Sequence, residues 1–125
     1  MNPQEAAHRW IKYWRSKETL EEGFVDVDAN ERVDDWVRED ADRGLEVILA
    51  ILEGIDAQPT SSVFQVLAAG PVEDLLVHHG PAVIDRIEQI AETDDRFNLL
   101  LGGVWQSSIA PDIWARVEKI RRKVW

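Results

Sequence analysis

Residues 66–105 read VLAAGPVEDLLVHHGPAVIDRIEQIAETDDRFNLLLGGVW, a helical stretch that a Gly-Pro pair interrupts twice. Glycine closes a helix at low cost because it adopts positive φ readily. Proline is tolerated in the first turn of the next helix because the N–H that it lacks would be unpaired there. The pattern therefore predicts that one helix ends and another begins at Gly70-Pro71 and again at Gly80-Pro81, with both glycines at positive φ.

Apolar residues spaced by three and four extend this helical pattern in both directions. Residues 17–29 are expected to be mainly loop, and no stretch alternates apolar and polar residues for long enough to predict a strand. The sequence therefore predicts a single all-α domain of about seven helices over residues 1–125. Their expected ranges are about 3–16, 30–54, 62–69, 71–79 and 81–93, then a helix from the Asp94 cap to Gly102-Gly103, and a last one opened by Ser107 or Ser108.

The longest of these, at residues 30–54, contains Gly44, which costs about 1 kcal/mol relative to alanine in a helix. A kink or a close contact between helices is expected there. The predicted core combines apolar residues from most of the predicted helices. It includes Trp105, which is expected to be buried. Its members are Trp10, Trp14, Leu49, Leu75, Ile84, Ile87, Leu100, Trp105 and Val117.

Composition narrows the class of protein. The chain has 125 residues, 45% of them hydrophobic and 30% charged, with no cysteine and a net charge of −10. No apolar run approaches the roughly 20 residues that span a bilayer, and the first residues do not form a signal peptide, so we expect a cytoplasmic protein that binds no membrane. The negative charge argues against direct binding of nucleic acid. No cofactor and no catalytic or metal-binding motif is predicted.

The charge is distributed unevenly. Residues 21–42 hold ten acids and two arginines, whereas residues 113–125 hold five basic residues and one acid. On the helix predicted at residues 30–54, Asp35, Glu39 and Asp42 share one side at i, i+4 and i+7. We call these three residues the acidic face and expect it to bind a basic protein partner. Two plainer interpretations are a solvated surface and pairing with the basic C-terminal helix of the same chain. The order of ligands in a calcium-binding loop is absent.

Six tryptophans are unusually many for a chain of this length. Five of them lie on or beside apolar stripes, so core packing is the expected role for most. Trp125 follows Arg121-Arg122-Lys123 and is the hardest to bury, so we group it with the acidic face as an expected partner-binding residue. Tryptophan and arginine are common anchors at protein interfaces.

Two adjacent histidines, His78 and His79, follow Asp74 by one helical turn. Neighbouring helical residues point about 100° apart, so the two rings do not converge on one metal ion. The expected arrangement is structural, with one histidine near a helix end bonded to carbonyl groups and the other exposed. An active site around Asp74, His78, His79 and Asp85 is the competing interpretation.

Part of the chain resembles an uncharacterised family of small bacterial helical proteins, a domain of unknown function. The elements that carry the resemblance are Gly70–Leu76, His79-Gly80, Ile84–Glu88, Asp94 or Asp95 with Phe97, and Gly103-Val104-Trp105. The resemblance covers roughly a third of the chain. It implies a helical fold and a bacterial or phage source, and it implies no activity.

Three classes of function follow. The first is a non-enzymatic acidic module that binds a basic protein, such as an immunity protein or a phage-type inhibitor. The second is a helical module that self-associates, as a homo-oligomer, without a ligand. The third is an enzyme that uses the Asp74, His78, His79 and Asp85 cluster, although no oxyanion donor or activating group is identifiable for it.

Overall fold

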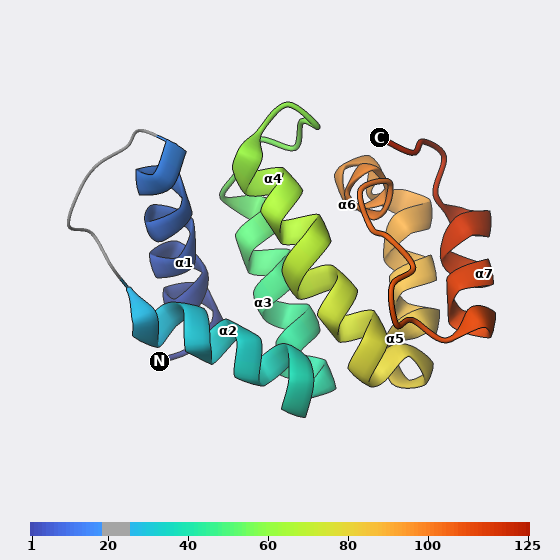
Figure 1. Cartoon of the computed structure of the whole chain (residues 1–125), viewed down its shortest axis with the longest axis horizontal. Helices are drawn as coiled ribbons and strands as arrows, with labels where there is room; N and C mark the ends of the chain where they lie inside the picture. The colour runs from blue at the N-terminus through green and yellow to red at the C-terminus, as the bar shows by residue number, and fades with distance from the viewer. Residues whose placement is uncertain (19–25) are drawn as a thin grey trace.

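The computed structural model describes residues 1–18 and 26–125 (Figure 1). Of the loop expected at residues 17–29, residues 19–25, which include two of the counted acids, lie outside the described part. The described residues contain no strand, which confirms the all-α prediction. The elements are α1 (Pro3–Glu18), α2 (Val27–Glu39), α3 (Ala41–Glu53), α4 (Ser62–Leu67), the π-helical turn η1 (Ala68–Val72), α5 (Glu73–Thr93), α6 (Asp95–Leu101) and α7 (Pro111–Ile120).

Helices α1, α2 and α3 pack against one another at the N-terminal end of the molecule (Figure 1). Arg9 of α1 holds Asp26 through two hydrogen bonds of 2.6 and 2.7 Å. The Asp26 carboxylate also accepts a hydrogen bond from the backbone N–H of Ala29, so it caps α2. The Trp14 indole donates to the side-chain oxygen of Asn30 at 3.1 Å. These bonds fix the start of α2 against α1.

The prediction of one long helix at residues 30–54 is wrong, because the helix is interrupted at Asp40. Asp40 has an extended backbone, with φ −140° and ψ 99°, and its side chain accepts from the N–H of Arg43 to cap α3. Gly44 lies just beyond the break, buried in α3. A Cβ there would lie 2.9 Å from the Cα of Val37, so the close contact between helices that was expected at Gly44 is confirmed. The change of direction lies four residues earlier, at Asp40.

The helix end predicted at Gly70-Pro71 is also wrong. α4, η1 and the first part of α5 form one long helix, coloured green to yellow in Figure 1. Gly70 does not have positive φ, and no atom lies within 4 Å of the place where its Cβ would be. The proline is accommodated because the chain widens into a π-helical turn at this point. At the other end of α4, Ser61 caps the helix.

The second Gly-Pro pair does mark a sharp change of direction. His79 leaves the helical region, with φ −134° and ψ 23°, and the rest of α5 runs back beside α7 (Figure 1). Pro81 lies in the first turn after this break, as predicted. The positive φ predicted for Gly80 is wrong. Glycine is needed there for space, since its Cβ would lie 3.0 Å from a side-chain carbon of Ile113 in α7.

The C-terminal part is joined through a buried asparagine that the sequence patterns did not mark. Asn98 in α6 donates to the carbonyls of Ala91 and Ile120, at 3.1 and 3.0 Å, and accepts from the N–H of Arg122 at 3.0 Å. It thereby ties α5, α6 and the segment after α7 together. Asp94 caps α6 as predicted.

The start of the last helix differs from expectation. α7 begins at Pro111, preceded by Ala110, so the caps predicted at Ser107 or Ser108 are wrong. It ends at Ile120, which leaves Val124 beyond the helix and 65% exposed. No helix in residues 1–18 or 26–125 is both long enough and apolar enough to cross a membrane.

The core prediction is largely confirmed. Of the predicted members, Trp14 and Leu49 are half-buried against the core. Trp105 is the exception, because it is 73% exposed. α6 ends at Leu101 and the chain leaves the helix at Gly102, so Trp105 does not continue the apolar stripe of α6. The buried members are Trp10, Leu75, Ile84, Ile87, Leu100 and Val117.

Candidate protein-binding surfaces

The acidic face lies on two helices instead of one. Asp35 and Glu39 are exposed on α2, four residues apart and therefore on the same side of that helix. Asp42 lies in the first turn of α3, beyond the break at Asp40. It is exposed, and its carboxylate lies 3.4 Å from the guanidinium of Arg86. Asp35 and Glu39 thus lie in the last turns of α2 and Asp42 in the first turn of α3, on either side of the corner at Asp40.

Next to this corner, the half-buried Asp34 has a raised pKa. Burial is the main cause, and the carboxylates of Asp74, Asp35 and Glu31 add to it, whereas Arg38 opposes it. The opposite case is Asp26, whose pKa is lowered chiefly by its hydrogen bonds to Arg9. Ionised Asp34 therefore disfavours the folded state, while ionised Asp26 favours it.

Replacing Asp34 by asparagine is expected to raise the urea midpoint of unfolding at pH 7. The gain in the urea midpoint should be complete at pH values above the raised pKa that Asp34 has in the folded protein. It should vanish as the pH falls below the pKa of an aspartate in the unfolded chain, about 3.9. Asp26→Asn, which can still cap α2, should lower the midpoint at pH 7, with the loss vanishing as the pH falls through the lowered folded pKa. Urea titrations from pH 7 to pH 3 test both variants. If the urea midpoints of both variants changed in the same direction relative to the wild type, the opposite pKa shifts given to Asp34 and Asp26 would be wrong.

The basic C-terminal helix does not pair with the acidic face. Arg116 of α7 binds Asp85 at 2.6 Å and also Glu88, both on α5. The two carboxylates raise the pKa of Arg116. Arg122 binds Asp95 of α6 at 2.8 Å. The pairing expected within the chain therefore exists, but its acidic partners are on α5 and α6 instead of α2 and α3.

A second surface was missed from the sequence. An open hollow of about 260 Å³ lies between the loop after α6, helix α7 and the C-terminal segment. Its walls carry large apolar side chains and one arginine, and we call it the aromatic groove. Its principal residues are Val104, Trp105, Trp114, Arg121, Val124 and Trp125.

Trp125 forms part of this groove and not part of the acidic face. Its ring stacks on buried Phe64, with centroids 5.3 Å apart, and its indole N–H donates to the carbonyl of Leu99 at 2.7 Å. In Figure 1 the C-terminus lies at the top of the view, whereas α2 runs along the lower left. The partner-binding role expected for Trp125 stays a prediction, but it concerns a different surface from that of Asp35, Glu39 and Asp42.

Two of the four residues of the competing active-site interpretation, His79 and Asp85, are bound to other groups. His79 donates through Nε2 to the carbonyl of Arg38 at 2.8 Å, and His78 is exposed, which agrees with the structural arrangement expected for the pair. Asp85 is bound by Arg116. In the described ranges, no group of three or more histidines and acids is placed to hold a metal ion.

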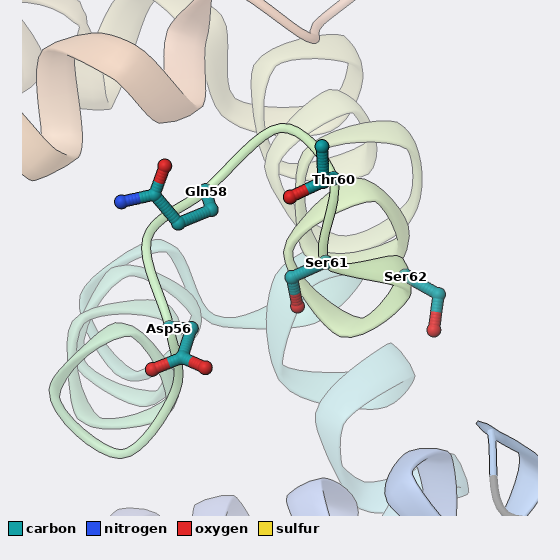
Figure 2. Close-up of a pocket in the computed structure, with 5 residues that line it drawn as sticks. All are labelled: Asp56, Gln58, Thr60, Ser61 and Ser62. Carbon is teal, nitrogen blue, oxygen red and sulfur yellow. The ribbon is translucent and has the colours of Figure 1, made fainter.

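A polar hollow of about 420 Å³ lies at the loop before α4, lined by Asp56, Gln58, Thr60, Ser61 and Ser62. Figure 2 shows that these side chains point in different directions around the loop, with Gln58 turned away from the serines. The Ser61 hydroxyl accepts from the N–H of Phe64 as the cap of α4. Nothing in this arrangement converges on a ligand.

Comparison with known proteins agrees with the resemblance to an uncharacterised family. The sequence model of one protein family, described as "Family of unknown function (DUF6869)", matches residues 17–124. No curated protein and no solved structure matches the chain.

Proposed function

The chain belongs to this family of unknown function, and we propose that it is a non-enzymatic protein-binding module whose acidic face docks onto a basic protein. The observation that supports the proposal is the excess of carboxylates over basic groups around the corner between α2 and α3. Residues 27–53 hold nine acids and three arginines. Asp35 and Glu39 are exposed, and no ion pair to either occurs within the part of the chain that the structure describes.

The three arginines of α2 and α3 cancel only part of the charge of the nine acids, which leaves a net charge of −6 over residues 27–53. The guanidinium groups of Arg32 and Arg43 lie over the ring of Trp36, at 5.9 and 5.8 Å from its centroid. Arg43 also lies 3.7 Å from Asp40, and the contact of Arg86 with Asp42 is long and exposed. Exposed ion pairs of this kind contribute little energy. The corner therefore keeps a negative potential.

Such a corner suits a protein that masks a basic surface, as an immunity protein or an inhibitor of phage type would. Complementary charge speeds the encounter of two proteins by about 10-fold to 1000-fold, and salt weakens the effect because the screening length is about 8 Å at physiological ionic strength. The proposed interface should therefore form quickly at low salt and more slowly as salt is added. A cytoplasmic location fits this role.

The test is a triple charge reversal, Asp35→Lys, Glu39→Lys and Asp42→Lys. A control with the same total charge reverses the exposed acids Asp56, Glu92 and Glu118; each reversal adds two charges, so both variants change from −10 to −4. Basic proteins that the wild type retains from a lysate of its native host should be lost with the first variant and kept with the control. Their association rate should fall by about tenfold or more at low salt.

Circular dichroism should show both variants folded, because the reversed side chains are exposed. The proposal is wrong if the wild type retains no basic protein at low salt, or if the two variants lose the same proteins to the same extent. Equal loss would mean that total charge, and not the acidic face, governs binding.

A further inference from the structure

The aromatic groove presents apolar surface to solvent: of the four large apolar side chains that are exposed in residues 1–18 and 26–125, two border it. Trp105 is 73% exposed and Val124 is 65% exposed, and both border the same hollow. Exposed apolar patches next to polar residues are typical of interaction sites, and tryptophan is the residue type most enriched among binding anchors. Helix α7 and the C-terminal segment, which form the groove with the loop after α6, lie on the other side of α4 from α2 in Figure 1, so the groove and the acidic face are separate surfaces.

The walls of the groove are held in place before any ligand arrives. The backbone N–H of Trp125 donates to the carbonyl of Gly102 at 3.1 Å, and its ring is fixed between Phe64 and the loop after α6. A Cβ at Gly103 would overlap this ring, so the glycine permits the close approach. Arg121 covers the ring of Trp114 at 4.7 Å and donates to the carbonyl of Val104 at 3.1 Å. Such preorganisation lowers the entropic cost of binding.

Two basic residues lie in or next to the groove without an acidic partner in the described residues: Arg121 in its lining, and Lys123 next to Val124 in the sequence. Arg121 hydrogen-bonds to carbonyl oxygens, and no carboxylate pairs with it in the described residues. Lys123 is exposed beside Val124, also without an ion pair in residues 1–18 and 26–125. Arg116 and Arg122, in contrast, are already bound to acids of α5 and α6. A ligand of this surface therefore needs carboxylates next to an apolar side chain.

We propose that the aromatic groove binds a short acidic peptide segment of a partner protein, which inserts one bulky apolar side chain into the hollow and places carboxylates against Arg121 and Lys123. A concave site of about 260 Å³ accommodates a single side chain. It is less suited to an anionic membrane, which a chain of net charge −10 would also repel over a wide area. A symmetric pairing of two copies would bring the same basic residues face to face.

The test is a selection from a library of random twelve-residue peptides on the immobilised full chain. Sequences that combine Asp or Glu with Leu, Ile, Phe or Trp should be enriched. Affinity for an enriched peptide, measured by fluorescence anisotropy, should fall roughly tenfold or more in Trp105→Ser, because an anchor residue is removed. Lys123→Glu should weaken binding less and reduce its dependence on salt.

Two controls separate this surface from the rest of the protein. Val27→Ser removes another half-exposed apolar side chain, 53% exposed and located on α2, and should leave the affinity unchanged. The triple reversal of the acidic face should also leave it unchanged, so a failure of that proposal does not affect this one. Trp105→Ser should fold normally, since its side chain is outside the core.

Three outcomes would overturn the proposal. The first is a selection that enriches no acidic-apolar peptide, and the second is an enriched peptide that binds Trp105→Ser as tightly as the wild type. The third is evidence that something else occupies the groove. The wild type would then float with anionic phosphatidylserine vesicles, or form a dimer in sedimentation equilibrium, and Trp105→Ser would abolish that behaviour.

Discussion

Replacing Phe97 by alanine is expected to lower the free energy of unfolding by about 3–5 kcal/mol, the usual loss when a buried aromatic ring is removed and a cavity remains. Phe97 in α6 is 0% exposed and lies within the core. Urea denaturation followed by circular dichroism at 222 nm measures the loss. Because much of the starting stability would be removed, a stabilised background or a low temperature keeps the folded baseline measurable.

Trp105 provides the matched comparison for Phe97. It is the larger side chain and lies only eight residues further on, but it is 73% exposed, so Trp105→Ala should cost less than about 1 kcal/mol. A loss at Trp105 as large as that at Phe97 would mean that the loop after α6 is packed differently. It would also remove the groove on which acidic-peptide binding depends.

Replacing Gly44 by valine is expected to destabilise the protein by about 3 kcal/mol or more, because overpacking usually costs 1–3 kcal/mol and here backbone stands in the way. The added Cβ would lie 2.9 Å from the Cα of Val37 and 3.1 Å from the carbonyl oxygen of Trp36. α2 and α3 would have to separate to make room. Equilibrium unfolding in urea measures the effect.

Gly70→Ala is the control, and it should act in the opposite direction. No atom lies within 4 Å of the position that its Cβ would occupy, and the backbone is not at positive φ. Alanine should therefore stabilise the protein by up to about 1 kcal/mol through its better helix propensity. If Gly70→Ala lowered the stability of the protein, that result would support the helix end that the sequence predicted at Gly70-Pro71.

Local signals identified the helix starts best. Asp94 acts as the predicted cap, and Ser61 caps α4 in the same way, because a short polar side chain before an apolar stripe can accept from free N–H groups, whereas the caps predicted at Ser107 or Ser108 are not used. Asp40 caps a helix in the same way, but apolar spacing on both sides of it continues without interruption. The break at Asp40 was therefore not predictable from spacing alone.

The Gly-Pro pairs show where a local signal is ambiguous. The same two residues occur at a sharp reversal after His79 and inside a continuous helix at Gly70-Pro71. What distinguishes them is tertiary packing, since α7 lies against Gly80 while nothing lies against Gly70. Neither position uses the positive φ that motivated the prediction.

The two surfaces differ in how much of each the sequence could predict. The acidic face follows from charge that is clustered in the chain, so its residues were identifiable, although their division between two helices was not. The aromatic groove combines a loop, a helix face and the C-terminal segment, which are separated by up to 20 residues. Spacing within one helix cannot show that Val104, Trp114 and Trp125 meet.

The π-helical turn at residues 68–72 has a consequence for insertions and deletions in related genes. A π-helical turn is in effect an α-helix with one additional residue, and each residue of an α-helix turns the chain by about 100°. Deleting one codon there would restore a regular helix but rotate everything after it by that angle. The side of α5 that carries Leu75, which packs against Gly44 of α3, would then turn away from α3. Homologous chains that keep this fold should therefore vary in length elsewhere, and conserve the number of residues between the Ser61 cap and the His79 break.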